Sequence, residues 1–104
     1  MMIIHNATFM VKKALEPRVV AWLKEEIAAT DTGAGYAPRI SAMREAGGVS
    51  HEHADAASVA FQLEFPDIDS ARCWSAQTFD GIADRFTAAF GGESMVFTSL
   101  FEIL

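Results

Sequence analysis

Residues 56–65, AASVAFQLEF, alternate between two kinds of side chain and decide the fold class. One parity is strongly apolar and consists of Val59, Phe61, Leu63 and Phe65. The other parity is small or polar and consists of Ser58, Ala60, Gln62 and Glu64. A period of two with β-branched and aromatic residues predicts a strand that buries one of its faces. The rest of the chain must therefore supply elements that cover this face.

A segment with helical periodicity precedes this strand, and another follows it. After Pro17, apolar residues recur at three- and four-residue spacing within residues 15–33 and predict an amphipathic helix of about three turns. We expect this helix to end at Gly33 and Gly35.

The second helical segment spans residues 66–92 and stops at its two terminal glycines. Asp67 or Asp69 is suited to cap its first turn, and Gly81 raises the question of a kink or a split. The predicted buried stripe of this segment is Ala71, Trp74, Thr78, Ile82, Phe86 and Ala89.

Three further segments predict strands. Residues 2–11 and 93–104 alternate in the same way as residues 56–65, and residues 36–46 do so more weakly. The order is therefore β-α-β-β-α-β in one domain over residues 1–104. This order predicts a ferredoxin-like α+β sandwich, in which both helices cover one face of a four-stranded antiparallel sheet.

The opposite, open face of the sheet is predicted to be mixed in character. In the last strand we assign the more apolar parity to the helix-covered side; it consists of Met95, Phe97, Phe101 and Ile103. The open face then carries Asn6, Thr8, Met10, Gln62, Glu64, Thr98, Leu100 and Glu102. This surface suits a partly polar interface with a second copy in a C2 homodimer, which would close an α+β barrel. A solvent-exposed sheet in a monomer is the alternative.

Composition excludes several classes of function. The net charge of −6 and the absence of a basic cluster argue against binding to nucleic acid. No stretch approaches the ~20 apolar residues that span a bilayer. A single cysteine, Cys73, suits a reducing compartment. We therefore expect a soluble cytoplasmic protein that binds neither nucleic acid nor membrane.

The stretch HEHAD, residues 51–55, is the strongest metal candidate. His51, His53 and Asp55 share a side in an extended chain, and two histidines with a carboxylate suit Zn or Fe. However, His51 and Asp55 would lie about 13 Å apart along a strand, whereas ligands of one ion lie within about 4 Å of each other. The stretch also falls where the second and third strands must turn. We predict a solvated hairpin tip, with no metal and no cofactor, and His51 and His53 as weak candidates.

The two ends of the chain carry recognisable motifs. MIIHNATFMV, from Met2, and FGGESMVFTSLFEIL, from Phe90, match the opening and closing strands of a family of short bacterial proteins classed only as a domain of unknown function. The chain resembles this family over nearly its whole length. The resemblance implies a ferredoxin-like fold and a dimeric barrel, but no activity. The family's His-Ile-Pro near the end of the first helix is absent from KEEIAATDTG, residues 24–33.

A looser resemblance links the chain to small dimeric α+β barrel proteins, which include haem-degrading and quinone-forming monooxygenases. This resemblance implies that Asn6 and Trp74 would line a pocket. The iron-ligating histidine of the haem-degrading members is missing from FDGIADRFTAAF, residues 79–90, so haem is not implied.

Three functions remain open. We favour a non-catalytic homodimer that binds or scaffolds, because no acid–base pair or nucleophile stands out; His5, on the helix-covered parity, is expected to be a core histidine. The alternative is a small-molecule enzyme of the monooxygenase or isomerase type whose open face orients a ligand through Asn6, Thr8, Gln62 and Glu64. The third is a metal-dependent protein that uses His51 and His53.

Overall fold

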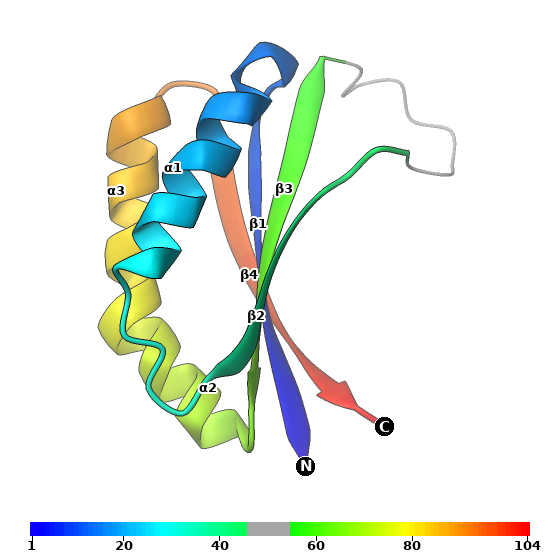
Figure 1. Cartoon of the computed structure of the whole chain (residues 1–104), viewed down its shortest axis with the longest axis vertical. Helices are drawn as coiled ribbons and strands as arrows, with labels where there is room; N and C mark the ends of the chain where they lie inside the picture. The colour runs from blue at the N-terminus through cyan, green and yellow to red at the C-terminus, as the bar shows by residue number, and fades with distance from the viewer. Residues whose placement is uncertain (46–54) are drawn as a thin grey trace.

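The computed structural model describes residues 1–45 and 55–104, and its elements follow the predicted order (Figure 1). The strands are β1 (Met2–Lys12), β2 (Tyr36–Ala42), β3 (Ala56–Phe65) and β4 (Met95–Ile103). They form one antiparallel sheet in the order β2-β3-β1-β4. The helical elements are η1 (Lys13–Leu15), α1 (Glu16–Ala28), α2 (Ile68–Trp74), η2 (Ser75–Phe79) and α3 (Asp80–Phe90). Both helical crossovers lie on the same side of the sheet, so the fold is the predicted ferredoxin-like α+β sandwich (Figure 1).

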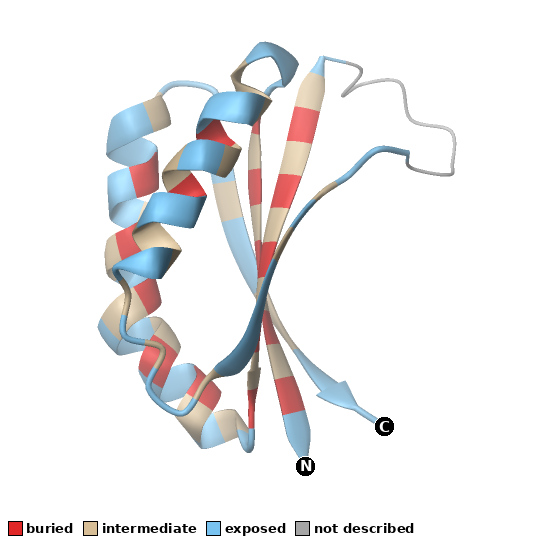
Figure 2. Ribbon diagram, in the orientation of Figure 1, coloured by how far each residue is buried: buried red, intermediate tan, exposed pale blue. Residues whose placement is uncertain are grey.

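The two central strands bury every second residue beneath the helices (Figure 2). The apolar parity of β3 is fully buried, as predicted from residues 56–65. It meets a core that is rich in aromatic rings, with Phe9, Phe79 and Phe86 among its largest buried side chains. Each such side chain contributes roughly 1.5–3 kcal/mol when it is fully removed from water.

Helix α1 follows the predicted pattern except at its end. Pro17 lies in the first turn, and Val19 and Leu23 are buried against the sheet. The helix ends at Ala28, so the predicted end at Gly33 and Gly35 is wrong. Gly33 instead adopts a φ of +57° in a turn where its N–H donates to Asp31 Oδ1. Within the described residues, no helix is long and apolar enough to cross a membrane.

Gly35 is required for a close approach. A Cβ atom at this position would lie 2.5 Å from Leu63 Cδ2 on β3, which is far inside van der Waals contact. The chain can therefore pass this closely over the buried sheet only without a side chain. Residue 35 thus brings the chain back to the sheet just before β2 begins.

The second helical segment is continuous, but it contains a π turn. Asp67 caps α2 by accepting a hydrogen bond from the Ser70 N–H at 2.7 Å. Gly81 lies inside α3 and does not split the helix. The irregularity is the π-helical η2, Ser75–Phe79, which holds one more residue per turn than an α-helix.

The extra residue brings Phe79, in place of Thr78, into the buried stripe, whereas the predicted Ile82 and Phe86 beyond the turn are buried. Phe79 is buried, whereas Thr78 is half-buried and Ala89 is exposed. The prediction that Thr78 and Ala89 belong to the buried stripe is therefore wrong. A strict period of 3.6 residues cannot anticipate the position at which a π turn changes the phase.

Strand β2 is the irregular edge of the sheet. Ala37 has a φ of +52°, and the pairing with β3 shifts its register between Tyr36 and Arg39. Pro38 lies inside this irregular stretch, which is an acceptable place for proline only on an edge strand. The weaker alternation of this segment is thus explained by its position.

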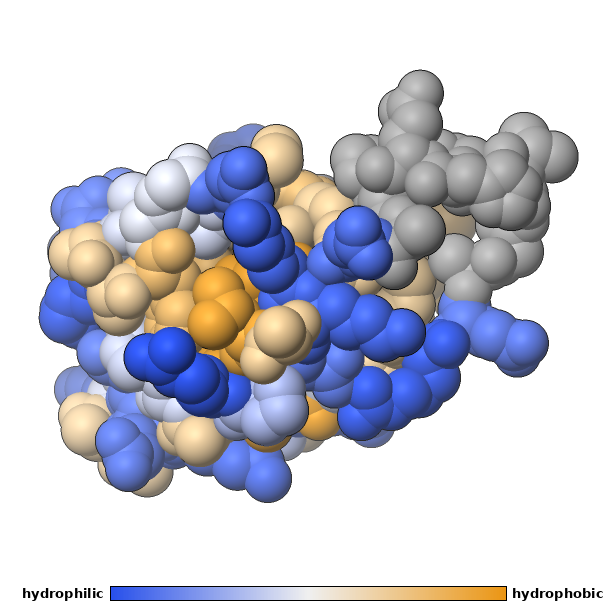
Figure 3. All heavy atoms as spheres, turned by 90° about the horizontal axis from the view of Figure 1, so that it is seen from above, coloured by the Kyte–Doolittle hydropathy of each residue, from blue (hydrophilic) through white to orange (hydrophobic). Residues whose placement is uncertain are grey.

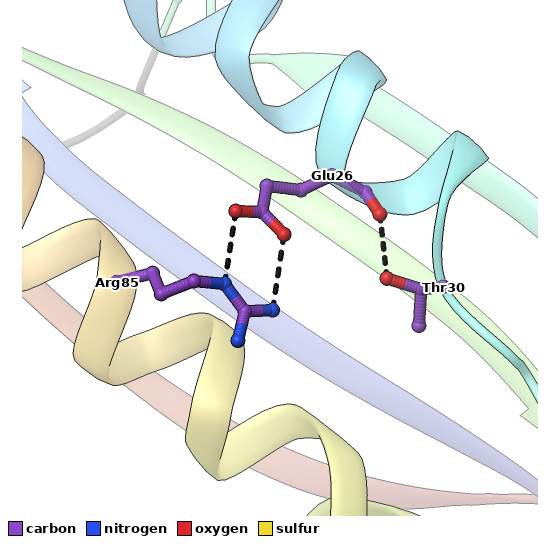
Figure 4. Close-up of polar contacts among 3 residues, drawn as sticks. All are labelled: Glu26, Thr30 and Arg85. Atoms are coloured by element: carbon purple, nitrogen blue, oxygen red, sulfur yellow. Dashed lines mark hydrogen bonds and ion pairs between the residues drawn. The ribbon is translucent and has the colours of Figure 1, made fainter.

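The two helices are joined across their exposed sides by a bidentate ion pair (Figure 4). Arg85 Nε and Nη2 on α3 each donate to a carboxylate oxygen of Glu26 on α1 at 3.0 Å. The Thr30 hydroxyl donates to the backbone carbonyl of Glu26 and closes the end of α1. This ion pair fixes the relative orientation of α1 and α3. It adds little to the free energy of unfolding, because it lies at the surface.

We expect the Phe79→Ala variant to lose about 3–5 kcal/mol of unfolding free energy, since it leaves a cavity in the core. The control is Thr78→Ala, which should cost about 1 kcal/mol or less. Urea unfolding followed by circular dichroism measures both. An equal or larger loss in Thr78→Ala would contradict the π turn.

Candidate functional site

Four of the predicted site residues share the open face of the sheet. Asn6 on β1 lies opposite Gln62 on β3. Asn6 Oδ1 accepts a hydrogen bond from Gln62 Nε2 at 3.1 Å, and Asn6 Nδ2 donates to Thr8 Oγ1 at 3.3 Å. Glu64 lies on the same face, opposite Ile4. The centre of the face is therefore a short row of polar groups that hydrogen-bond to one another.

The structure corrects the predicted faces of β4. Leu100 lies opposite His5 and Thr98 lies opposite Ala7, both of which are buried residues of β1. Opposed residues of antiparallel strands share a face. Thr98, Leu100 and Glu102 therefore lie on the helix-covered side, and their predicted placement on the open face is wrong.

The open face instead receives the more apolar parity of β4. We call the four large side chains of this parity the β4 strip: Met95, Phe97, Phe101 and Ile103. Phe97 is 48% exposed and Phe101 54% exposed. These residues are uncovered because they lie on the face of the sheet opposite the helices, as their pairing with β1 shows, and the helices cover only the other face (Figure 2). The open face thus combines a polar row with an uncovered apolar strip.

Trp74 does not line this face. It is buried on the other side of the sheet, where its indole N–H donates to the Asp31 carbonyl at 2.9 Å. Phe61, Phe65 and Phe79 surround its ring. Asn6 and Trp74 therefore lie on opposite faces of the sheet, and the predicted role of Trp74 as a wall of the same pocket is wrong.

His5 is fully buried in this aromatic core. Its ring forms a T-shaped pair with Trp74 at 5.2 Å and a tilted pair with Phe79 at 5.1 Å between centroids. Nε2 lies 3.0 Å from Ser75 Oγ, whereas Nδ1 has no hydrogen-bond partner among the described residues. Burial lowers the pKa of His5 below its ordinary value of 6.5, and its own backbone carbonyl weakly opposes this effect. His5 is therefore a neutral core histidine with one nitrogen satisfied.

Ser75 connects this buried histidine to the surface. It lines a groove of about 240 Å³ between the second helical segment and β4. We call this the Ser75 groove, and it is lined by Arg72, Ser75, Ala76, Asp80, Thr98 and Leu100. Thr98, which was predicted for the open face, belongs here. Sequence reasoning missed Ser75, although the inward parity of His5 was a signal that a polar partner should lie on the facing helix.

A second pocket of about 270 Å³ lies at one end of the sandwich, where Val11, Leu15 and Phe90 meet. Figure 3 looks onto this end and shows hydrophobic side chains gathered among hydrophilic ones. An ion pair between Lys12 and Glu93 at 3.1 Å lies at its rim. This pocket has room for a small apolar group.

The metal candidates His51 and His53 lie outside the described residues. Within residues 1–45 and 55–104, no three side chains of the metal-binding types come together as a site.

The buried His5 predicts a stability that depends on pH. As the pH falls below 6.5, the unfolded chain binds a proton at His5 that the folded chain resists. The wild-type free energy of unfolding should therefore fall more than that of a His5→Gln variant, which keeps every other titrating group. Urea unfolding one pH unit above and below 6.5 measures the difference. Equal losses in the two proteins would contradict the lowered pKa.

The same fold occurs in solved structures of other proteins. A de novo designed protein, Foldit4, matches over 100% of both chains with a TM-score of 0.59 and 8% identity. SnoaB, a cofactor-independent oxygenase from Streptomyces nogalater, matches over 99% of this chain and 93% of its own, with a TM-score of 0.55 and 19% identity. Likenesses at such low identity establish the fold alone.

Comparison of the sequence itself identifies the family of the chain, which the shared fold does not. No curated protein matches the chain. The profile of a family described as a domain of unknown function, DUF4286, matches residues 2–104. The predicted resemblance to a domain-of-unknown-function family is thus confirmed, and the chain belongs to the DUF4286 family.

Proposed function

We propose that this protein is a homodimeric binding module whose two copies pack through their open sheet faces. The observation that carries the proposal is the β4 strip. A strand at the edge of a sheet would ordinarily turn its apolar parity toward its own core, but here that parity points away from both helices. Contiguous exposed apolar surface of this kind marks an interaction site.

The open face is large enough for a stable dimer. Four strands spaced about 4.8 Å apart, each about 30 Å long, present roughly 570 Å² per subunit. Two such faces together exceed the ~1,000 Å² that a specific interface requires. A C2 axis would place the same patch on both sides of the interface, which is the commonest arrangement of homodimers.

The polar row fits the same interface. Asn6, Gln62 and Thr8 already hydrogen-bond to one another, so their burial leaves fewer groups without a partner. Packing through this face also leaves accessible the Ser75 groove and the pocket at the end of the sandwich, beside Val11, Leu15 and Phe90, because both lie elsewhere on the subunit. We propose these two hollows as the places where a small ligand binds.

The alternative is a small-molecule enzyme that uses the open face, and it has less support. Its fold is shared with SnoaB, which is a cofactor-independent oxygenase. However, the amide groups of Asn6 and Gln62, which would orient a substrate, are engaged with each other.

A cytoplasmic location agrees with this proposal. Cys73 is exposed and carries a free thiol. Exposed free thiols persist in reducing compartments.

We expect a Phe101→Glu variant to be monomeric at a concentration where the wild-type protein is dimeric. The substitution buries one unpaired carboxylate per subunit and brings like charges together, which costs several kcal/mol. Since 1.4 kcal/mol is a tenfold change, the Kd should rise by about 100-fold or more. Sedimentation equilibrium at micromolar concentration measures the change.

The matched control is Ala88→Glu, which adds the same charge at an exposed position of α3 on the helix side. This variant should remain dimeric. A monomeric wild-type protein, or equal weakening by both substitutions, would show that the open face is not the interface.

A further inference from the structure

We propose that Ser75 is a nucleophile for small, uncharged esters, with His5 as its general base. This acyl-transfer site would lie in the Ser75 groove, and it goes beyond the proposed binding function. The proposal rests on the geometry that joins a buried imidazole, a hydroxyl and a surface hollow.

The contact between the two side chains has the geometry of a base and its nucleophile. His5 Nε2 and Ser75 Oγ are 3.0 Å apart, within the range over which a general base accepts a proton. Because burial lowers the pKa of His5, its imidazole is neutral near neutral pH and can accept that proton. With the ring proton on Nδ1, the lone pair of Nε2 faces the Ser75 hydroxyl.

The helix presents Ser75 to the groove. Ser75 is the first residue of the π turn, and π turns occur frequently at functional sites. Through this turn Trp74 remains in the core while Ser75, the next residue, lines the groove. The hydroxyl therefore touches both the buried base and the surface hollow.

The groove also defines the class of substrate. Arg72 lies one turn before Ser75, is exposed, and forms no ion pair with any described residue, so its guanidinium is able to stabilise a developing oxyanion. Asp80 lines the same groove, and its carboxylate repels an anionic substrate. Leu100 and Ala76 supply apolar surface for a short acyl chain. Together these groups favour a neutral ester over a free carboxylate.

The reaction balances without a cofactor. Ser75 Oγ bonds to the ester carbonyl carbon, and the hydroxyl proton moves to His5 Nε2. The bond to the leaving alcohol then breaks, and Nε2 returns the proton to the leaving oxygen. Water repeats the two steps on the acyl-serine, which releases a carboxylic acid and restores Ser75.

The missing partner of Nδ1 determines the expected rate. In a serine–histidine–aspartate triad, loss of the carboxylate function lowers kcat by about 10⁴. No described residue supplies such a group to His5. The site should therefore react slowly, and acylation of the enzyme is a better readout than turnover.

The test is acetylation by p-nitrophenyl acetate, followed by intact mass and peptide mapping. We expect acetyl-Ser75 in the wild-type protein and in the control Ser70→Ala, which removes another serine of the same helix. Ser75→Ala should lose this modification, and His5→Gln should slow it by about 100-fold or more. Acetylation confined to lysines or the amino terminus, or a wild-type rate in His5→Gln, would overturn the proposal.

A second variant keeps the test sound if His5→Gln does not fold. Ser75→Cys introduces a thiol beside the imidazole, and the exposed Cys73 serves as an internal reference. The introduced thiol should react with iodoacetamide faster than Cys73 near neutral pH, because His5 favours the thiolate. Reaction at Cys73 alone would show that the groove does not present an activated residue 75. Neither experiment depends on the dimer.

Discussion

Two helices can cover only the middle of a four-stranded sheet. In this protein they cover β1 and β3, whose alternate residues are buried without exception along the centre of the sheet. Strand β4 receives its register from hydrogen bonds to β1, not from the helices. The backbone pairing therefore turns Phe97 and Phe101 toward the open face, where they are exposed and no helix covers them. The division of the sheet into a sealed face and an open face follows from this constraint.

The helix-covered face of the described residues contains one buried polar side chain, that of His5. His5 replaces what would otherwise be another apolar residue in the alternation of β1, and its ring is enclosed by Trp74 and Phe79. Burial of an imidazole is tolerated when the neutral form dominates and one nitrogen finds a partner. Ser75 is this partner, and it also lines the Ser75 groove. The contact between His5 and Ser75 therefore gives the buried imidazole a hydrogen-bond partner and also forms the geometry of the proposed acyl-transfer site.

Much of the fold could be predicted from the sequence because period two and period 3.6 are local signals. Residues 56–65 alone identified a half-buried strand, and the element order then determined the sandwich. The face of β4 could not be predicted from its own composition, because its more apolar parity lies on the open face and not on the helix-covered side. Thr98 and Glu102 were misplaced for this reason.

The site was harder to predict than the fold. Asn6, Thr8 and Gln62 were correctly brought together, since cross-strand neighbours follow from parity. The contact between His5 and Ser75 joins residues that are 70 positions apart, and no local pattern reports it. The π turn adds a second obstacle, because it shifts the helix phase where the contact forms.

The π turn changes the spacing of the buried aromatic residues along the sequence. Trp74 and Phe79 stand five positions apart, although both point into the same core. In an α-helix, residues five positions apart differ by about 140° in direction, so the wider π turn is what allows both rings to face the core. An unbroken α-helix would instead place two such residues on one face at a spacing of three or four positions. The spacing of these two buried aromatic residues is therefore a record, within the sequence itself, of the extra residue in the turn.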